Sequence, residues 1–434
     1  MTKYKAYNNY KDSEILWLGN IPSHWNVQRT KNLFKLICNP APKNNNEELL
    51  SVYTDIGVRP RRELEQKGNK ASTTDNYWIV KKNDIIVNKL LAWMGAIGIS
   101  KYDGVTSPAY DVLRKRFDLN PDYYNYIFRS TVIRYELKRH SKGIMDMRLR
   151  LYFDELGQIK LPNPPIKEQS IIASFLDQKT NEISNFIALK KRTISLLKER
   201  KTTIINQAVI KGLDPNVEMT ESGIEWLGDI PKHWKIKKLK YLAKIKTGGK
   251  DTVDKVDDGI YPFYVRSDNV EKINSYSFDG EAILTAGDGV GVARVFHYAT
   301  GKFDYHQRVY RISNFKEVLG RFLFFYISEN LKKEVFKTSV STTVDSLRLP
   351  MFLNFPVIIP DEIEQIEIVS FIEAEVSKID HVISQAEKEI NLIREYQQNL
   401  ISEAVTGKID LRDISKMKYL DCDLLVEERM QKVN

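Results

Sequence analysis

The chain has 434 residues, and its 66 Lys and Arg against 57 Asp and Glu give a formal net charge of +9. Its 42% hydrophobic and 11% aromatic residues can bury several cores, which excludes a disordered or collagen-like chain, and its length predicts roughly two to three domains. The positive charge permits a polyanionic partner but is too modest for this length to prove one.

No segment has the pattern of a membrane span or a secretion signal. The longest apolar run, residues 90–99, is shorter than the about 20 residues that a bilayer requires, and the amino-terminal residues MTKYKAYNNYKD are polar. Cys38 and Cys422 stand alone in the sequence, which excludes a disulfide framework and a cysteine zinc site. We therefore expect a soluble chain in a reducing, cytoplasmic setting with no membrane contact.

A tryptophan-rich motif near the amino terminus occurs again in the middle of the chain. The 16 residues EILWLGNIPSHWNVQR begin at position 14, GIEWLGDIPKHWKIKK begins at position 223, and eight positions are identical. His24 and His233 recur beside Trp25 and Trp234, so we expect them in a tryptophan-packed corner rather than as metal ligands. The histidines offer no close pair at metal-binding spacing, and we expect no metal site.

The segment that follows each motif has the pattern of a compact mixed domain. Residues 26–163 contain strand-like runs (LLSVYTDIGV, YWIV, DIIVNKLL, AIGISKY, YDVLRKR) and a helix candidate at residues 121–140. Residues 235–359 contain YPFYVRS, EAILTAG, VGVARVF and RVYRIS, with a helix candidate at residues 319–337. Strands mixed with helices predict two α+β domains, although the two segments show no convincing sequence similarity to each other.

Two longer stretches are expected to form long helices. Residues 164–209 and 360–405 align without a gap, with 14 of 46 positions identical, and neither contains glycine before Gly212 or Gly407. Their apolar residues recur at helical spacing over several heptads, which predicts an antiparallel coiled coil. Two surface helices, each on its own domain, are the alternative. The residues expected in the helix contact are Leu176, Ile183, Leu197, Ile204, Ile372, Ile379, Ile393 and Leu400.

These elements predict an α+β protein with a pseudo-two-fold internal repeat. Its parts are a first domain (residues 1–163), a central helix (164–212), a second domain (213–359), a distal helix (360–411) and a tail (412–434) without an assigned role. The central tryptophan motif follows its helix directly, whereas the counterpart is divided between the two chain ends. A pseudo-two-fold arrangement would therefore bring the chain ends together.

The motifs of common enzyme sites are missing or incomplete. No phosphate-binding loop of the form G-x-x-x-x-G-K-[ST] occurs, and the cluster Gly287, Gly289 and Gly291 has Val292 in place of the third glycine of a dinucleotide fingerprint. A tight turn between strands explains this cluster better. The string at residues 163–166, NPPI, resembles the N-P-P-aromatic loop of adenine methyltransferases, but Ile166 is not aromatic and cannot stack on an extruded base. We expect a non-catalytic chain without a bound cofactor.

Basic, hydroxyl and amide residues in the two segments are candidates for contacts with double-stranded DNA. Such side chains make phosphate and base-edge contacts, although each one alone is better explained as a solvated surface residue, and only the set as a whole favours DNA. Aromatic residues interleave with them at Trp93 and at residues 305–307. The candidates in the first segment are Arg59, Arg61, Arg62, Lys70, Ser72, Thr73, Thr74, Lys89, Arg148 and Arg150. Those in the second are Lys246, Thr247, Lys250, Arg266, Ser267, Gln307, Ser339, Ser341, Thr342 and Thr343.

The order of these motifs resembles that of the specificity subunits of type I restriction–modification enzymes. W-L-G-x-I-P-x-H-W stands at residues 17–25 and 226–234, and Glu-Gln follows a proline at residues 168–169 and 364–365 before each long helix. The resemblance covers essentially the whole chain. It implies two target-recognition domains that each read one half of an asymmetric, bipartite DNA site, joined by two helices that set their spacing.

The resemblance also implies partners. Two modification subunits would dock on the helices, bind S-adenosylmethionine and methylate adenine, and restriction subunits would use ATP and Mg²⁺ for translocation and cleavage. The chain itself would hold none of these cofactors. A stand-alone adenine methyltransferase or nuclease with built-in recognition is the alternative, and a coiled-coil scaffold without salt-dependent DNA affinity is a third possibility.

Overall fold

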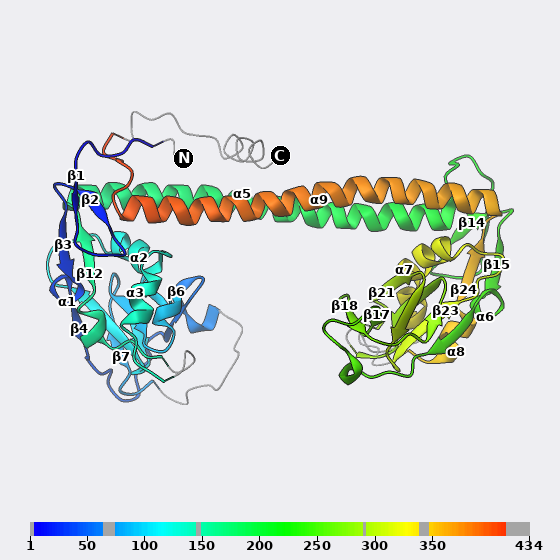
Figure 1. The fold of residues 1–434 in the computed structure, drawn as a ribbon, viewed down its shortest axis with the longest axis horizontal. Coiled ribbons are helices and arrows are strands. Elements are labelled where there is room, and N and C mark those ends of the chain that lie inside the picture. The colour runs from blue at the N-terminus through cyan, green and yellow to red at the C-terminus, as the bar shows by residue number, and fades with distance from the viewer. Residues whose placement is uncertain (1–3, 64–73, 145–148, 290–291, 338–346, 414–434) are drawn as a thin grey trace. The chain divides into compact units, whose positions relative to one another are not determined.

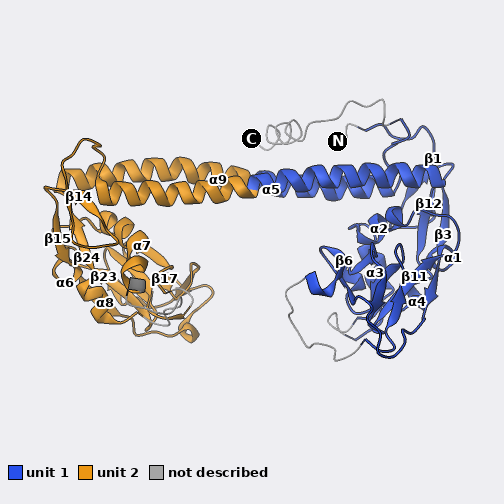
Figure 2. Cartoon of the chain, turned by 180° about the vertical axis from the view of Figure 1, so that it is seen from behind, with its two compact units in different colours: residues 1–190, 387–434 blue, residues 191–386 orange. Residues whose placement is uncertain are grey.

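The computed structural model describes residues 4–63, 74–144, 149–289, 292–337 and 347–413. It divides into two compact units, one made of Met1–Lys190 with Glu387–Asn434 and the other of Lys191–Ala386 (Figure 2). Each unit contains a mixed domain and part of both long helices, α5 (Ile166–Lys211) and α9 (Glu362–Val405) (Figure 1). The predicted α+β class is confirmed. In the described ranges, no helix combines the length and hydropathy of a membrane span.

The first unit is built around a four-stranded antiparallel sheet in the order β4-β11-β8-β9. Its strands are β4 (Phe34–Ile37), β8 (Ile85–Asn88), β9 (Ile97–Ile99) and β11 (Tyr110–Lys115). Two-stranded pairs are β1 (Tyr10–Asp12) with β2 (Asn20–Pro22), β3 (Asn26–Arg29) with β12 (Lys160–Asn163), β5 (Leu50–Tyr53) with β6 (Gly57–Pro60), and β7 (Trp78–Val80) with β10 (Gly104–Thr106). The helices of this domain are α1 (Thr30–Leu33), α2 (Pro121–Arg129), α3 (Arg134–Arg139) and α4 (Phe153–Leu156).

The second unit contains a sheet of the same kind, in the order β16-β23-β20-β21, and a second sheet in the order β18-β17-β22-β19. The first sheet has β16 (Lys244–Thr247), β20 (Ala282–Ala286), β21 (Phe296–Ala299) and β23 (Val309–Ser313). The second has β17 (Tyr261–Tyr264), β18 (Val270–Ile273), β19 (Phe278–Asp279) and β22 (Lys302–Tyr305). The pairs are β13 (Met219–Glu221) with β14 (Asp229–Pro231), and β15 (Lys235–Lys238) with β24 (Pro356–Ile359). Its helices are α6 (Leu239–Leu242), α7 (Gly320–Lys337) and α8 (Leu349–Asn354).

The two domains share a topology that their sequences do not reveal. Both four-stranded sheets place their strands in the chain order first, fourth, second, third. In both, an antiparallel pair joins the start of the segment to its end, with Asn26 opposite Asn163 in one and Lys235 opposite Ile359 in the other. The two segments therefore share one sheet topology, although their sequences are not similar.

The long helices complete the core of each domain. In the first unit, Leu176 and Ile183 of α5 share a buried cluster with Ile393 and Leu400 of α9 and with Trp25. At about 25 cal/mol per Å² of buried apolar surface, each such side chain contributes about 2 kcal/mol. In the second unit, Ile205 of α5 and Ile372 of α9 join the cluster that contains Trp234 and Phe322. Separating helix from domain would therefore expose the core of that domain.

Within each unit the two helix segments run antiparallel (Figure 1), and ion pairs join their surfaces. Lys190 Nζ lies 2.7 Å from Glu389 in the first unit, and Lys201 Nζ lies 2.8 Å from Asp380 in the second. Such partly exposed pairs contribute less than about 1 kcal/mol each, so the apolar contacts dominate.

Six of the eight predicted helix-contact residues are buried, but Leu197 and Ile204 are only half-buried. The buried positions in that part of α5 are Ile194 and Ile205, which lie 11 and 22 residues after Ile183. A strict seven-residue series drifts about 20° per heptad around a straight α-helix, whereas an 11-residue step stays close to one face. Leu197 and Ile204 therefore lie at the edge of the buried face rather than at its centre.

Residues near the two chain ends lie against each other in the first unit. Tyr10 donates a hydrogen bond to the Gly407 carbonyl (3.1 Å), the Lys408 ammonium donates to the Asn20 carbonyl (2.5 Å), and the Asp410 amide donates to the Lys5 carbonyl (2.7 Å). The predicted proximity of the chain ends is confirmed for these residues. In the second unit, Gly212 lies close to Trp234 along a continuous chain.

Gly407 has no room for a side chain, and we expect Gly407→Ala to lower the free energy of unfolding by about 2–4 kcal/mol. Its φ is +72°, a left-handed conformation, and a Cβ atom would lie 2.4 Å from Pro22 Cδ. The control is Gly228→Ala, because Gly228 has φ +68° and open space around its Cβ position, so that only backbone strain of about 1 kcal/mol is expected. Urea unfolding of the full chain measures both, and equal losses would contradict a steric role for the Pro22 contact.

The helix candidate at residues 121–140 is two helices rather than one. Ser130 ends α2 in an extended conformation, and its hydroxyl donates to the Ile127 carbonyl (2.7 Å) instead of leaving it to a continuing helix. Most of the strand-like runs contain the expected strands, and the candidate at residues 319–337 is confirmed as α7.

One strand prediction, VGVARVF, is wrong over its described residues before Phe296. Val292, Ala293 and Val295 are buried against the core of the second unit, but Ala293 has φ +50° and the Val292 amide donates to Gly289 (3.1 Å) in a turn. Their apolar character therefore reflects packing of a loop. The described glycines of this cluster lie between β20 and β21, as expected for a connection between strands, but this connection is longer than the predicted tight turn.

Candidate nucleic-acid interface

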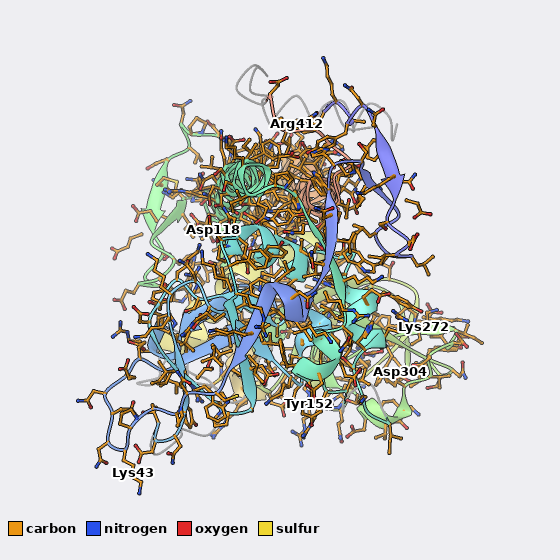
Figure 3. All side chains as sticks on the ribbon, turned by 90° about the vertical axis from the view of Figure 1, so that its left-hand side faces the viewer. Lys43, Asp118, Tyr152, Lys272, Asp304 and Arg412 are labelled. Carbon is orange, nitrogen blue, oxygen red and sulfur yellow. The ribbon has the colours of Figure 1, made fainter. Side chains whose placement is uncertain are left out.

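The tryptophan motif and the start of the long helix meet at one buried carboxylate in the first unit. Glu168, 8% exposed, accepts hydrogen bonds from Trp25 Nε1 (3.0 Å) and the Tyr7 hydroxyl (3.0 Å), and its other oxygen lies 2.7 Å from His24 Nε2. Burial raises the pKa of Tyr7 and the Glu168 charge raises it further, so Tyr7 remains a neutral donor. Arg412, labelled in Figure 3, lies over the Tyr7 ring at 5.0 Å. This cluster ties the motif to the first turn of α5.

The second unit repeats this contact in a more open form. Glu364 Oε2 accepts a hydrogen bond from Trp234 Nε1 (3.1 Å) and lies 2.9 Å from His233 Nε2. The Glu364 side chain is 31% exposed, against 10% for Glu168. The expectation that both histidines lie in a tryptophan-packed corner is confirmed, and no metal-binding group of His, Cys, Asp or Glu occurs among the residues searched, which are the described ones.

The glutamine that follows each of these carboxylates links the long helix to a helix of the domain. Gln169 Oε1 accepts from the amide of Asn120, the N-cap of α2, at 2.9 Å, and Gln169 Nε2 donates to the Pro164 carbonyl at 2.8 Å. Gln365 Oε1 accepts from the Leu319 amide, next to α7, at 2.7 Å. The sequence analysis noted both Glu-Gln pairs but missed these partners, which only the folded chain brings together. The repeated motifs therefore have a structural role.

In the second unit, a hydrogen-bonded turn between β22 and β23 presents two polar side chains. The Val309 amide donates to the His306 carbonyl (2.9 Å), so Gln307 and Arg308 are the central residues of a β-turn, and both are exposed. Neighbouring loops hold the turn: the Gln307 amide donates to the Lys250 carbonyl (2.7 Å), and the Gly287 amide donates to the Arg308 carbonyl (2.8 Å). We call residues 306–309 the recognition turn.

His306 supports the recognition turn from inside the domain. It is 1% exposed, and its Nδ1 accepts a hydrogen bond from the Arg308 amide (2.9 Å), so the proton of the neutral ring lies on Nε2. That nitrogen lies 3.5 Å from Asp251 Oδ1. Tyr305 is also buried, so within residues 305–307 only Gln307 is available to a ligand.

Two carboxylates hold the polar side chains beside the turn. Asp288 accepts from Arg308 Nη1 (2.7 Å) and Arg266 Nη1 (2.8 Å), and Asp251 Oδ2 accepts from Gln307 Nε2 (2.5 Å). Burial alone raises the pKa of Asp288, but the hydrogen bonds and charges of Arg266 and Arg308 outweigh it and hold that pKa below its ordinary value. Asp288 therefore stays ionised near neutral pH and orients both guanidinium groups.

The structure brings some predicted residues of the second segment together. Lys250, Arg266, Ser267 and Gln307 belong to loops around the recognition turn, where His297 Nε2 also lies 2.9 Å from the Ser267 carbonyl. Lys246 and Thr247 lie exposed on β16. Ser339, Ser341, Thr342 and Thr343 lie outside the described residues. The sequence analysis missed Arg308 and the two carboxylates, although Arg308 directly follows a predicted residue.

The predicted residues of the first segment lie on separate elements. Arg59 is on β6, with its guanidinium 3.4 Å from the Tyr102 hydroxyl, and Arg61 and Arg62 form a short 3-10 helix in which Arg62 pairs with Glu48 (3.0 Å). Thr74 donates to an Asn45 side chain (3.0 Å), Lys89 contacts Asp111 (3.3 Å) and the Pro108 carbonyl (3.0 Å), and Arg150 is exposed. Lys70, Ser72, Thr73 and Arg148 lie outside the described residues.

A basic and aromatic pocket of about 350 Å³ lies beside α3 in the first unit. It is lined by Trp93, Met94, Arg134, Tyr135 and Lys138. The Lys138 ammonium lies 5.3 Å from the centre of the Trp93 ring, a cation–π contact. Arg134 and Lys138 stand one helical turn apart, a spacing that could have identified them in the sequence.

The sequence matches the family described as "Type I restriction modification DNA specificity domain" over residues 22–198 and 231–392. The chain belongs to this family. It is 26% identical over 454 aligned residues to the MjaVIII specificity subunit of Methanocaldococcus jannaschii, covering 96% of this chain and 99% of that protein. It is 28% identical over 182 residues to the EcoDI specificity subunit of Escherichia coli, a match that covers 42% of this chain and 40% of that protein.

The fold has a match among solved structures as well. A chain from a study of complex assembly and conformational transition in the type I R-M system superposes with a TM-score of 0.69 at 13% identity, covering 90% of this chain and 99% of that chain. At this identity the likeness concerns the fold. As a member of the specificity family, the chain is a DNA-recognition component of a restriction–modification system and is not its catalytic subunit.

Proposed function

We propose that the chain reads a bipartite, asymmetric DNA site, with one half-site recognised by each α+β domain. The observation that carries this proposal is the shared sheet topology of two domains whose loops differ. Each domain would present its own side chains at the same place in a common fold, so that two different sequences are read. The recognition turn in the second domain and the Trp93 pocket in the first are the surfaces that we assign to this role.

We further propose that α5 and α9 act together as an antiparallel coiled coil that sets the spacing between the half-sites, within a pseudo-two-fold chain. Two modification subunits would dock on these helices and supply S-adenosylmethionine, and restriction subunits would supply the chemistry that needs ATP and Mg²⁺. The complex would work in the cytoplasm, where its DNA lies. If this chain bound S-adenosylmethionine without partners, that result would contradict the assignment of this cofactor to the modification subunits and would favour a stand-alone methyltransferase.

Exchange of one domain is expected to change one half of the methylated site. The paired strands β3–β12 and β15–β24 bring the ends of each segment together, so residues 26–163 or 235–359 can be replaced by the matching segment of a relative with another specificity. The measurement is genome-wide mapping of methylated adenines in cells that carry the chimera and its modification partner. The two reciprocal chimeras control for each other, and a change in both halves from one exchange would contradict independent reading.

A further inference from the structure

Gln307 is oriented by its contact with Asp251 in a way that leaves one hydrogen-bonding pattern free. A carboxylate only accepts hydrogen bonds, so the amide nitrogen must face Asp251 Oδ2 at 2.5 Å, and one of its two N–H groups is used there. The second N–H and the carbonyl oxygen remain on the exposed side chain, and they lie side by side when Asp251 binds the N–H that is trans to the carbonyl. This donor–acceptor pair complements N7 and N6 of adenine in the major groove.

Arg308 is oriented in the same manner by Asp288. One N–H of its Nη1 is used at 2.7 Å, its side chain is 59% exposed, and the planar guanidinium carries further N–H donors. Two parallel donors of this kind complement O6 and N7 of guanine. Asp288 also accepts a hydrogen bond from Arg266 Nη1 at 2.8 Å, so one carboxylate holds both guanidinium groups.

The two carboxylates favour base edges over phosphates as the target of the turn. Asp251 and Asp288 would repel a phosphate brought to the same place, and Gln307 has no charge with which to attract one. Consecutive residues are about 3.8 Å apart, close to the about 3.4 Å rise of a base pair. The backbone of the turn is fixed by Lys250, Gly287 and buried His306, so little order has to be gained on binding.

We propose that Gln307 and Arg308 read an adenine and a guanine in neighbouring base pairs of the half-site recognised by the second domain, with Asp251 and Asp288 as positioning residues. This inference rests on the proposed function. The first domain has the same turn before β11, where the Tyr110 amide donates to the Ser107 carbonyl (2.9 Å), but its central residues are Pro108 and Ala109. The two central side chains of that turn carry no donor to read a base, so we expect the first domain to read its half-site with other elements.

The test combines methylation mapping with binding by the complex of the full chain and its modification partner. The domain exchange identifies the half-site that the second domain recognises. In the wild-type complex, this half-site should contain adjacent A·T and G·C pairs. Arg308→Ala should relax only the guanine position and Gln307→Ala only the adenine position, with a loss of about 5- to 150-fold in discrimination measured on duplexes with single base-pair changes. Pro108→Ala, at the matching turn, is the control and should leave both half-sites unchanged.

Asp288→Asn separates positioning from charge. It should weaken discrimination at the guanine position while non-specific affinity for DNA rises, because one negative charge is removed. An unchanged methylated site in the Arg308 and Gln307 variants would overturn the proposal. So would an equal loss of affinity for all duplexes, with the salt dependence of binding reduced by about one charge, because that indicates a phosphate contact. Loss of all DNA binding in a variant with a native circular dichroism spectrum would overturn it as well. Failure of the proposed function itself would appear in wild type, as a site whose halves do not follow the exchanged domains.

Discussion

Replacing Glu168 with alanine is expected to lower the free energy of unfolding of the first unit by about 3–5 kcal/mol. The carboxylate is buried and accepts from Trp25 and Tyr7, with His24 Nε2 at 2.7 Å, so its removal leaves buried donors without an acceptor at about 1–3 kcal/mol each. Because this cluster ties the tryptophan motif to α5, unfolding should begin there. Hydrogen–deuterium exchange of the full chain would show faster exchange in residues 14–29 and in the first turns of α5.

The matched control is Glu364→Ala in the second unit. Glu364 makes the corresponding contacts with His233 and Trp234, but its side chain is 31% exposed, so water can replace the lost acceptor and about 1 kcal/mol is expected. Glu168→Gln keeps the shape and one acceptor oxygen and should fall between the two. Equal losses for Glu168→Ala and Glu364→Ala would contradict the importance of burial at this carboxylate.

The repeat was readable in the sequence because both copies perform the same packing task. Trp25 and Trp234 must each meet a carboxylate at the start of a long helix, and this requirement fixes residue types at fixed spacing. Helix starts after proline and ends before glycine are local properties, so the bounds of α5 and α9 were predicted to within a few residues. The hydrogen bonds of Gln169 and Gln365 with Asn120 and Leu319 were not predicted, because these partners lie in segments without sequence similarity.

The shared sheet topology of the two domains could not be predicted from their sequences. A sheet of this kind requires only that buried positions be apolar, as Ile85, Ile86 and Val87 are on β8 and Ala282, Ile283 and Leu284 are on β20. Many combinations of apolar residues satisfy that requirement. Two domains can therefore have the same sheet topology without having identical residues at corresponding positions. If each domain reads its half-site with its own loops, as we propose, function does not require identical residues in the two domains.

The candidate interface was predicted by residue type but not by arrangement. Lys250, Arg266 and Gln307 lie in separate stretches of sequence, and only the sheet order places their loops around one turn. Asp288, which orients Arg308, looked like part of a glycine-rich turn, and acidic residues are not expected where DNA binds. Asp288 accepts hydrogen bonds from the guanidinium groups of Arg266 and Arg308, and these contacts join segments that are separate in the sequence.

Inserting residues into both long helices is expected to change the spacing between unchanged half-sites. Four residues added after Lys190 and four after Ala386, which are the boundaries of the compact units, would lengthen the pair by about 6 Å. Base pairs rise about 3.4 Å each, so the preferred spacer should grow by one or two base pairs. Because four residues fall just beyond one turn of 3.6, the buried Ile194 and Ile390, which follow the two insertions, stay nearly in phase with Ile183 and Ile379, which precede them.

A two-residue insertion at the same places is the matched control, and its effect should be larger. It turns the following part of each helix by about 200°, so that residues such as Ile194 and Ile205 rotate to the solvent side and the helix pair loses its apolar contact. Methylation should then be lost, with circular dichroism and thermal melting showing a destabilised fold, whereas the four-residue variant should fold and methylate a site with a longer gap. Methylation mapping measures the gap directly. An unchanged gap in a folded, active four-residue variant would show that α5 and α9 do not set the spacing, since no other property of the half-sites is altered by the insertion.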